Sequence, residues 1–442
     1  MSAAADPLPS LFARAAAALA GVPPPELTDG VTAFVAARGA AVVDDLDALI
    51  EATPDSAAAD WVRGEALAAL DRLAAACDEL RYAADLDESA VAPLWRLAEF
   101  EVERDRPAEA ADAWDAVADR GLDDVHVYAA LGEALLDADE PTRAVAAFEE
   151  GLALAPGDAR LLAGRAAASL ALDLDDDALQ DAEAAVRSDG DALEAWETLA
   201  RVRLARGEAE AARDAIDRLL ALSPRHPEGL RLRGDARWDA GDVAGAVADY
   251  TAALAAEPDD VETRIAAAEG QLRLGDAAAA LASAARALAL DDGDADAIAF
   301  AARAEAALGR RAKARARLDA ALDRTDAPAV LYHTRGELHA HDGQPNLAWR
   351  DARLAIDADP DFGPAYVLRA RMALELETAD EALADLDAAV ELDEKDGEAL
   401  AWRGLAHQRA GHRADAERDW AAADAALPPG HPLRAELSRW RA

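Results

Sequence analysis

Three residues in the C-terminal half of the sequence are spaced for metal chemistry. His333, Glu337 and His341 follow one another at intervals of four, which places them on one face of a helix. Imidazole and carboxylate groups are common zinc ligands. Three ligands on one straight helix span about 12 Å, so at most two neighbours can share an ion. We rank a polar patch that contacts a partner ahead of metal binding, and keep a metal-dependent enzyme centred on this patch as a weaker alternative.

Other signatures of catalysis or cofactor binding are absent from the sequence. It contains no GxGxxG, GxxxxGK[ST], HExxH or GxSxG motif and no pair of CxxC motifs. The single cysteine, Cys77, cannot form an internal disulfide, and its apolar helical position favours a core role in a reducing compartment. We therefore predict a protein that is not an enzyme and that has no cofactor and no metal site.

The charge balance narrows the class of partner. The chain has 88 acidic and 45 basic residues, for a formal charge of −43, and its two lysines are Lys313 and Lys395. Such a surface excludes general attraction to nucleic acid or anionic lipid. Its acidity fits either GC-rich codon usage or a salt-rich cytoplasm, while an acidic groove that mimics nucleic acid is a less favoured interpretation. No targeting signal and no apolar run of membrane-spanning length is visible, so we expect a cytoplasmic protein without membrane insertion.

The strongest pattern is a 34-residue repeat. Residues 91–430 divide into ten consecutive segments without an insertion or deletion. Position 8 of the segments is always Ala or Gly: Ala98, Gly132, Ala166, Ala200, Gly234, Ala268, Ala302, Gly336, Ala370 and Gly404. Position 20 is always Ala: Ala110, Ala144, Ala178, Ala212, Ala246, Ala280, Ala314, Ala348, Ala382 and Ala416. Small residues fixed at two places predict two helices per segment that cross at close range.

The remaining positions predict where each helix packs and ends. Large apolar residues recur at positions 4 and 24 and fill the space that the small residues leave. Position 15 is Gly in six segments, where the first helix ends in a left-handed residue: Gly207, Gly241, Gly275, Gly309, Gly343 and Gly411. Position 32 is Pro in five segments, which stops the second helix: Pro156, Pro224, Pro258, Pro360 and Pro428.

This pattern resembles the tetratricopeptide repeat. The resemblance implies an all-α, right-handed superhelical solenoid of helix-turn-helix units with helical caps. We assign 1–56 to an N-terminal helical cap, 57–90 to a degenerate repeat, 91–430 to ten tandem repeats and 431–442 to a C-terminal capping helix. The degenerate repeat has no Gly or Pro between its helices, so a hairpin and one long helix both remain open.

Positions 7 and 23 vary together. Position 7 is Arg in five segments, and position 23 of the same five is Asp: Arg165 with Asp181, Arg233 with Asp249, Arg335 with Asp351, Arg369 with Asp385, and Arg403 with Asp419. The other five segments have Ala, Ser or Arg at position 23. We predict an Arg–carboxylate bridge between the two helices of a repeat.

The family resemblance implies a concave groove lined by positions 2, 5, 9, 12 and 13 of each first helix. Carried onto this chain, it predicts the following partner-binding residues: Trp95, Glu99, Glu103, His126, Glu133, Asp137, Glu197, Arg201, Arg231, Asp235, Trp238, Glu269, Arg303, His333, Glu337, His341 and Arg371. The N-terminal part of this set is acidic with Trp95 as an aromatic anchor, so we expect it to prefer a basic segment.

The functional hypothesis that follows is a scaffold or adaptor that binds a peptide or helical segment of another protein. The Lys and Asn pattern with which some family members hold a chain-terminal carboxylate is missing. The alternative is a regulatory subunit or effector that acts through residues 1–56. The sequence does not specify the oligomeric state or the partner's identity.

Overall fold

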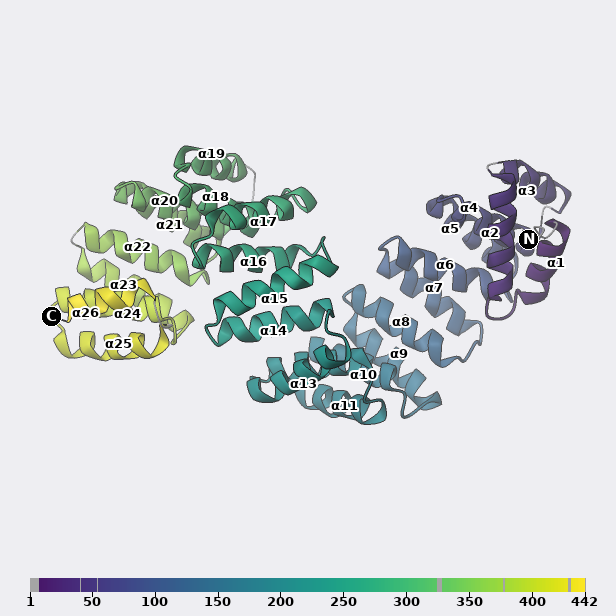
Figure 1. Cartoon of the computed structure of the whole chain (residues 1–442), viewed down its shortest axis with the longest axis horizontal. Coiled ribbons are helices and arrows are strands. Elements are labelled where there is room, and N and C mark those ends of the chain that lie inside the picture. Colours follow the sequence, from purple (N-terminus) through teal and green to yellow (C-terminus); the bar gives the residue numbers. More distant parts are fainter. Residues whose placement is uncertain are drawn as a thin grey trace. The chain divides into compact units, whose positions relative to one another are not determined.

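The computed structural model is built from short helices in hairpins (Figure 1). It describes residues 8–39, 41–53, 55–323, 328–376, 378–427 and 431–441. These residues form 26 helices and no strand. The chain divides into two compact units, Met1–Leu222 and Ser223–Ala442, and each is described by itself.

The first unit contains helices α1 to α13. Their bounds are α1 Leu8–Ala18, α2 Pro25–Arg38, α3 Ala41–Ala52, α4 Ala57–Ala68, α5 Leu73–Leu86, α6 Ala92–Glu103, α7 Pro107–Asp119, α8 Val125–Asp137, α9 Pro141–Leu154, α10 Ala159–Ala171, α11 Asp175–Ser188, α12 Leu193–Ala205 and α13 Ala209–Leu222. From α4 onward, each even-numbered helix pairs with the next odd-numbered one.

The second unit contains helices α14 to α26. Their bounds are α14 Pro227–Asp239, α15 Val243–Ala256, α16 Val261–Arg273, α17 Ala277–Leu290, α18 Ala295–Ala307, α19 Arg311–Leu322, α20 Ala329–His341, α21 Pro345–Ala358, α22 Gly363–Glu375, α23 Ala379–Leu392, α24 Gly397–Arg409, α25 Arg413–Ala426 and α26 Pro432–Trp440. The predicted helical solenoid is confirmed in both units. Pro428 lies outside the described residues.

The small residue at position 8 is where the two helices of a hairpin touch. A methyl group added to Gly132 would lie 2.5 Å from the Phe148 ring, and one added to Gly404 would lie 2.4 Å from the Trp420 ring. Phe148 and Trp420 occupy position 24 of the same repeats and are buried. In these two repeats, helix spacing is therefore set by a glycine on one helix and an aromatic ring on the other.

A left-handed residue at position 15 ends the first helix of most hairpins. The six predicted glycines all have positive φ, between 69° and 87°. Asp takes the same conformation at this position in the first unit: Asp71, Asp105, Asp139 and Asp173, with φ between 57° and 60°. Asp tolerates this region better than most residues. Because Asp71 reverses the chain between α4 and α5, residues 57–90 form a hairpin, and the alternative of one long helix is wrong.

The five predicted Arg–Asp bridges are confirmed. In each, the Arg Nε and Nη2 atoms donate to the two carboxylate oxygens of the Asp 16 residues later, at 2.6–2.9 Å. Two parallel hydrogen bonds fix the relative position of the two helices. In repeat 295–328 the roles are exchanged, because Arg317 at position 23 donates to the buried carboxylate of Glu305 on the first helix.

Helices outside the regular repeats close both ends. Helices α1, α2 and α3 pack on α4, and the backbone amides of Val91 and Ala92 donate to the carbonyl of Leu19 at 2.7 and 2.9 Å. At the other end, Leu437 of α26 is buried together with Trp420, and Trp440 lies 5.0 Å from Trp402 between ring centroids. These contacts cover apolar surface that a terminal repeat would otherwise expose.

Two further expectations can be checked in the described part of the chain. No helix there is long and apolar enough to cross a membrane. Cys77 is fully buried in α5, as its apolar position predicts, and burial raises the pKa of its thiol.

Candidate functional site

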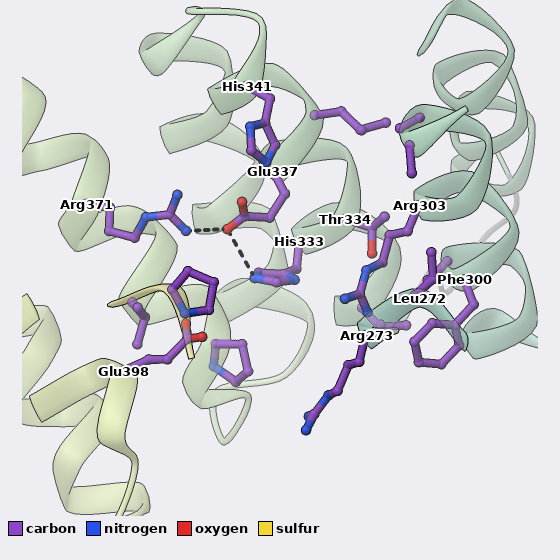
Figure 2. A pocket seen from close by; sticks show the side chains of 18 of the residues that line it. Leu272, Arg273, Phe300, Arg303, His333, Thr334, Glu337, His341, Arg371 and Glu398 are labelled. Carbon is purple, nitrogen blue, oxygen red and sulfur yellow. Dashed lines mark hydrogen bonds and ion pairs between the residues drawn. The ribbon is translucent and has the colours of Figure 1, made fainter. Parts of the chain in front are cut away.

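The first helices of five consecutive repeats line a groove in the second unit (Figure 2). Its volume is about 1060 Å³, and its walls come from α16, α18, α20, α22 and α24, with the start of α26 at one end. Among the described second helices, α19 alone contributes a lining residue, Arg311 at its first position. The groove is thus a property of the repeated first helices and not of one irregular loop.

Five of the predicted partner-binding residues meet in this groove. They are Arg303 from α18, His333, Glu337 and His341 from α20, and Arg371 from α22. The spacing of four brings the three α20 residues to one face, as the sequence indicates. Figure 2 shows them on the groove side of their helices.

His333, Glu337 and Arg371 form a polar network across two repeats. Arg371 Nη1 donates to Glu337 Oε1 at 2.7 Å, and His333 Nε2 lies 3.9 Å from the same oxygen. Burial lowers the pKa of His333 to about 4, opposed by Glu337 and reinforced by the positive charges of Arg303 and Arg371. His333 is therefore neutral near pH 7, and its ring packs edge-on against Phe362 at 5.5 Å.

This network gives no support to a metal site at the histidine patch. The Glu337 carboxylate is already paired with Arg371. Within the described residues, the one group of three potential ligands with mutually close ligand atoms lies elsewhere, around the turn between α24 and α25. The patch is better suited to polar recognition than to holding an ion.

Arg303 differs from the other basic side chains of the groove. Its guanidinium lies over the Phe300 ring at 5.2 Å, and it makes no ion pair or hydrogen bond with any described residue. By contrast, Arg371 pairs with Glu337, Arg311 lies 3.7 Å from Asp342, and Arg273 lies 3.2 Å from Glu269. Arg303 is exposed and so presents a positive charge to whatever enters the groove.

The lining of the groove is less acidic than the chain as a whole. Its lining residues include four arginines and three carboxylates: Arg273, Arg303, Arg311, Arg371, Glu337, Asp396 and Glu398. The whole chain has 88 acidic and 45 basic residues. Arg273 and Arg311 are paired with Glu269 and Asp342, which do not line the groove, and Arg371 is paired with Glu337, so the positive charge offered to an anionic group is that of Arg303.

The predicted aromatic anchor of the first unit, Trp95, is packed against other side chains. Trp95 is only 6% exposed, and its ring lies against Trp114 and stacks on His126. Its indole Nε1 donates to Glu99 at 2.8 Å. The ring of Trp95 is thus covered by neighbouring side chains, and its role as an anchor for a partner stays a prediction.

Part of the predicted acidic surface of the first unit is already neutralised. Glu133 accepts two hydrogen bonds from Arg160 at 2.6 Å, and Glu99 pairs with Arg96. Glu103 and Asp137 remain exposed. The preference of this surface for a basic segment stays a prediction. It depends on fewer unpaired carboxylates than the sequence indicates.

The remaining predicted residues are not among those that line the groove. Glu197 and Arg201 lie on α12, 3.9 Å apart. On α14, Arg231 pairs with Glu228 and Asp235. Trp238 of α14 packs under Arg273 at 4.3 Å, and Glu269 of α16 pairs with the same arginine. Most of these charged side chains are therefore engaged with neighbours in the same helix.

The prediction from repeat positions 2, 5, 9, 12 and 13 did not include several residues that line the groove. Arg273 and Glu398 occupy positions 13 and 2, so the rule itself could have included them. Phe300 and Trp402 occupy position 6, one residue after position 5, which the prediction included. Both residues contribute apolar surface to the groove wall. No sequence signal marks His431, which enters from the segment before α26.

The comparisons with known proteins agree with this architecture. A tetratricopeptide-repeat family model matches residues 96–159, 165–227 and 231–295. No curated protein matches the sequence. The class is an all-α solenoid of helical hairpins. Within it, the matched segments 96–159, 165–227 and 231–295 are tetratricopeptide repeats.

Several solved structures are similar to this chain at low sequence identity. Yeast Tom70 is 12% identical, with a TM-score of 0.50 over 87% of this chain and 95% of its own. A human IFIT1 dimer with m7Gppp-AAAA is 17% identical, with a TM-score of 0.47 over 84% and 90%. The Cut9–Hcn1 assembly of the APC/C is 15% identical, with a TM-score of 0.47 over 98% and 87%.

Proposed function

We propose that this protein is a non-enzymatic scaffold that binds an extended or helical segment of another protein in the groove of its second unit. The observation that carries the proposal is the groove itself, which the first helices of five successive repeats build together. Recognition of a peptide by such a surface needs preformed walls and a few placed polar groups, and the described residues supply both.

The chemistry of the walls indicates what such a segment should contain. Phe300, Phe362 and Trp402 supply apolar surface, and the neutral His333 ring adds a polar edge. Arg303 supplies a positive charge without a partner among the described residues. A segment with an acidic side chain beside an apolar one satisfies both features, because a carboxylate matches the guanidinium and the apolar group covers the rings.

The proposal can be tested with peptides selected on the whole protein. Peptides from a random display library would be selected on the wild-type chain and their affinities measured by fluorescence anisotropy. We expect selected peptides to be enriched in acidic and apolar residues. Arg303→Glu should weaken their binding by about tenfold or more, because it removes an attraction and adds a repulsion.

The chain offers a matched control for this reversal of charge. Arg353 is also exposed and also lies over an aromatic ring, Trp349 at 5.8 Å, but it is on the second helix α21 and does not line the groove. Arg353→Glu should leave peptide affinity unchanged. If both variants lose binding equally, or Arg353→Glu alone loses it, the groove is not the binding surface.

A further inference from the structure

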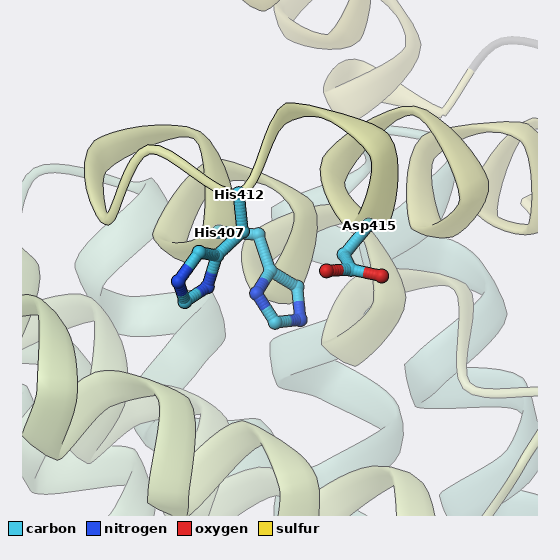
Figure 3. Close-up of side chains that lie close together, drawn as sticks. All are labelled: His407, His412 and Asp415. Atoms are coloured by element: carbon cyan, nitrogen blue, oxygen red, sulfur yellow. The ribbon is translucent and has the colours of Figure 1, made fainter.

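Three potential metal ligands gather at the turn of the tenth repeat (Figure 3). His407 lies in the last turn of α24, His412 immediately precedes α25, and Asp415 lies in the first turn of α25. One ligand atom from each side chain lies within 4.8 Å of the other two. The two imidazole rings are 5.6 Å apart between centroids. This cluster is outside the groove.

The tenth repeat leaves one atom of His407 without a partner. His407 Nδ1 is buried and makes no hydrogen bond, which is rare for a buried polar atom. The other ring nitrogen, Nε2, faces Asp419 Oδ2 at 3.8 Å, and Arg403 holds that carboxylate in place. A proton on Nε2 directed at a carboxylate leaves the Nδ1 lone pair free, which is the usual arrangement of a histidine that binds metal.

In the eighth repeat, the equivalent histidine has both ring nitrogens engaged. His339 occupies the same repeat position as His407, and its Nε2 lies 3.7 Å from Asp351. There the Nδ1 atom is paired with Gln344 Oε1 at 2.8 Å. Gln344 and Leu347 stand at the repeat positions of His412 and Asp415. The tenth repeat therefore replaces a hydrogen-bonding amide by an imidazole and an apolar residue by a carboxylate.

We propose that His407, His412 and Asp415 bind one divalent transition-metal ion, with zinc as the preferred ion. Two imidazoles and one carboxylate form a common zinc ligand set, with water as the fourth ligand. His412 is exposed and Asp415 is partly exposed. The Oδ1 atom of Asp415 lies 3.0 Å from the exposed Arg418, while its Oδ2 atom makes no ion pair or hydrogen bond with a described residue. The ion would join α24 to α25 at the chain reversal. This proposal replaces the sequence-based expectation that the chain has no metal site.

Zinc titration of the whole chain tests the proposal. Isothermal calorimetry in excess Mg²⁺, which occupies nonspecific carboxylate sites, should show one zinc per wild-type chain. His412→Ala and Asp415→Asn should each weaken zinc binding by about tenfold or more. His339→Ala is the matched control and should leave it unchanged. No zinc uptake by the wild type, or equal uptake by His412→Ala, would overturn the site.

A transplant into the eighth repeat tests the geometry independently. Gln344→His combined with Leu347→Asp places the same three ligand types around His339. We expect the double variant to bind a second zinc per chain, while its helical circular dichroism stays that of the wild type. A folded double variant that still binds one zinc would show that repeat position and residue type do not define the site.

Discussion

At the scale of single residues, the Arg–Asp bridges place a buried carboxylate against a partly buried guanidinium. Asp181, Asp249, Asp351 and Asp419 are 3–6% exposed. A carboxylate at such depth needs its hydrogen bonds, since an unpaired buried charge is costly. Replacing both partners by apolar residues is much less harmful than removing one. The paired change of positions 7 and 23 among the repeats is consistent with this asymmetry.

The pair Arg369 and Asp385 is well suited to a test of coupling, because the two side chains hydrogen-bond to each other through both carboxylate oxygens. Arg369→Leu and Asp385→Ala should each lower the free energy of unfolding by about 1–3 kcal/mol. The double variant should lose clearly less than the sum, with a coupling of about 1 kcal/mol or more, because neither charge is then stranded. Urea unfolding measures all four proteins. Strictly additive losses would mean that the bridge contributes nothing of its own.

These bridges could be predicted because two positions change together across ten copies of one motif. The burial of Trp95 could not. Its position places it on the first helix, but its exposure depends on Trp114 and His126, which come from two other helices. The pairing of Glu133 with Arg160 likewise crosses from one repeat to the next. The position of a residue within a repeat therefore predicts which face of the helix it lies on. It predicts less well whether its side chain is exposed or already paired with a neighbour.

At the scale of helices, position 8 and position 24 act as a size pair in several repeats, although Ala98 with Trp114 and Gly336 with Ala352 depart from it. Gly132 faces Phe148, Gly234 faces Tyr250, and Gly404 faces Trp420 at 2.4–2.5 Å from an added methyl group. In repeats 295–328 and 363–396, position 8 is Ala and position 24 is Leu. A larger residue on one helix is thus accompanied by a smaller residue on the other in these repeats.

Gly132→Ala tests this size pair. The new methyl group would overlap the Phe148 ring, which outweighs the better helix propensity of Ala, so we expect a net loss of about 1 kcal/mol in unfolding free energy. In a Phe148→Leu background, the same change should be neutral or stabilising, because that pair occurs elsewhere in the chain. The midpoint of urea unfolding gives both values. An equal loss in the two backgrounds would place the strain somewhere other than the ring.

The helical hairpins were predictable from the repeat, but the turns that contain a left-handed Asp at position 15 were not. Gly at position 15 signals a left-handed residue, whereas Asp71, Asp105, Asp139 and Asp173 adopt the same conformation without that signal. Asp favours helix caps as well as turns, and in this chain it also stands within helices such as α11, so a single Asp does not mark a turn. The hairpin of residues 57–90 was uncertain for this reason alone.

At the scale of the whole molecule, the excess of negative charge is the main electrostatic feature. If every basic side chain paired with one acidic side chain, 43 of the 88 acidic residues would still lack a partner. Many observed ion pairs join exposed residues, such as Arg187 with Glu183 and Arg439 with Glu436, and such pairs add little stability. Repulsion among the unpaired acidic groups therefore opposes the folded state.

Added salt should raise the melting temperature of this protein. From about 0.1 M to about 1 M salt the screening length falls from about 10 Å to about 3 Å, which weakens repulsion between separated carboxylates more than the contact pairs of buried groups. Most of the rise should occur below about 0.5 M, because screening saturates, whereas effects of salt exclusion grow at higher concentration. Thermal unfolding followed by circular dichroism in sodium chloride and potassium chloride measures the profile. A melting temperature that stays constant or falls below about 0.5 M would show that the acidic groups are compensated locally.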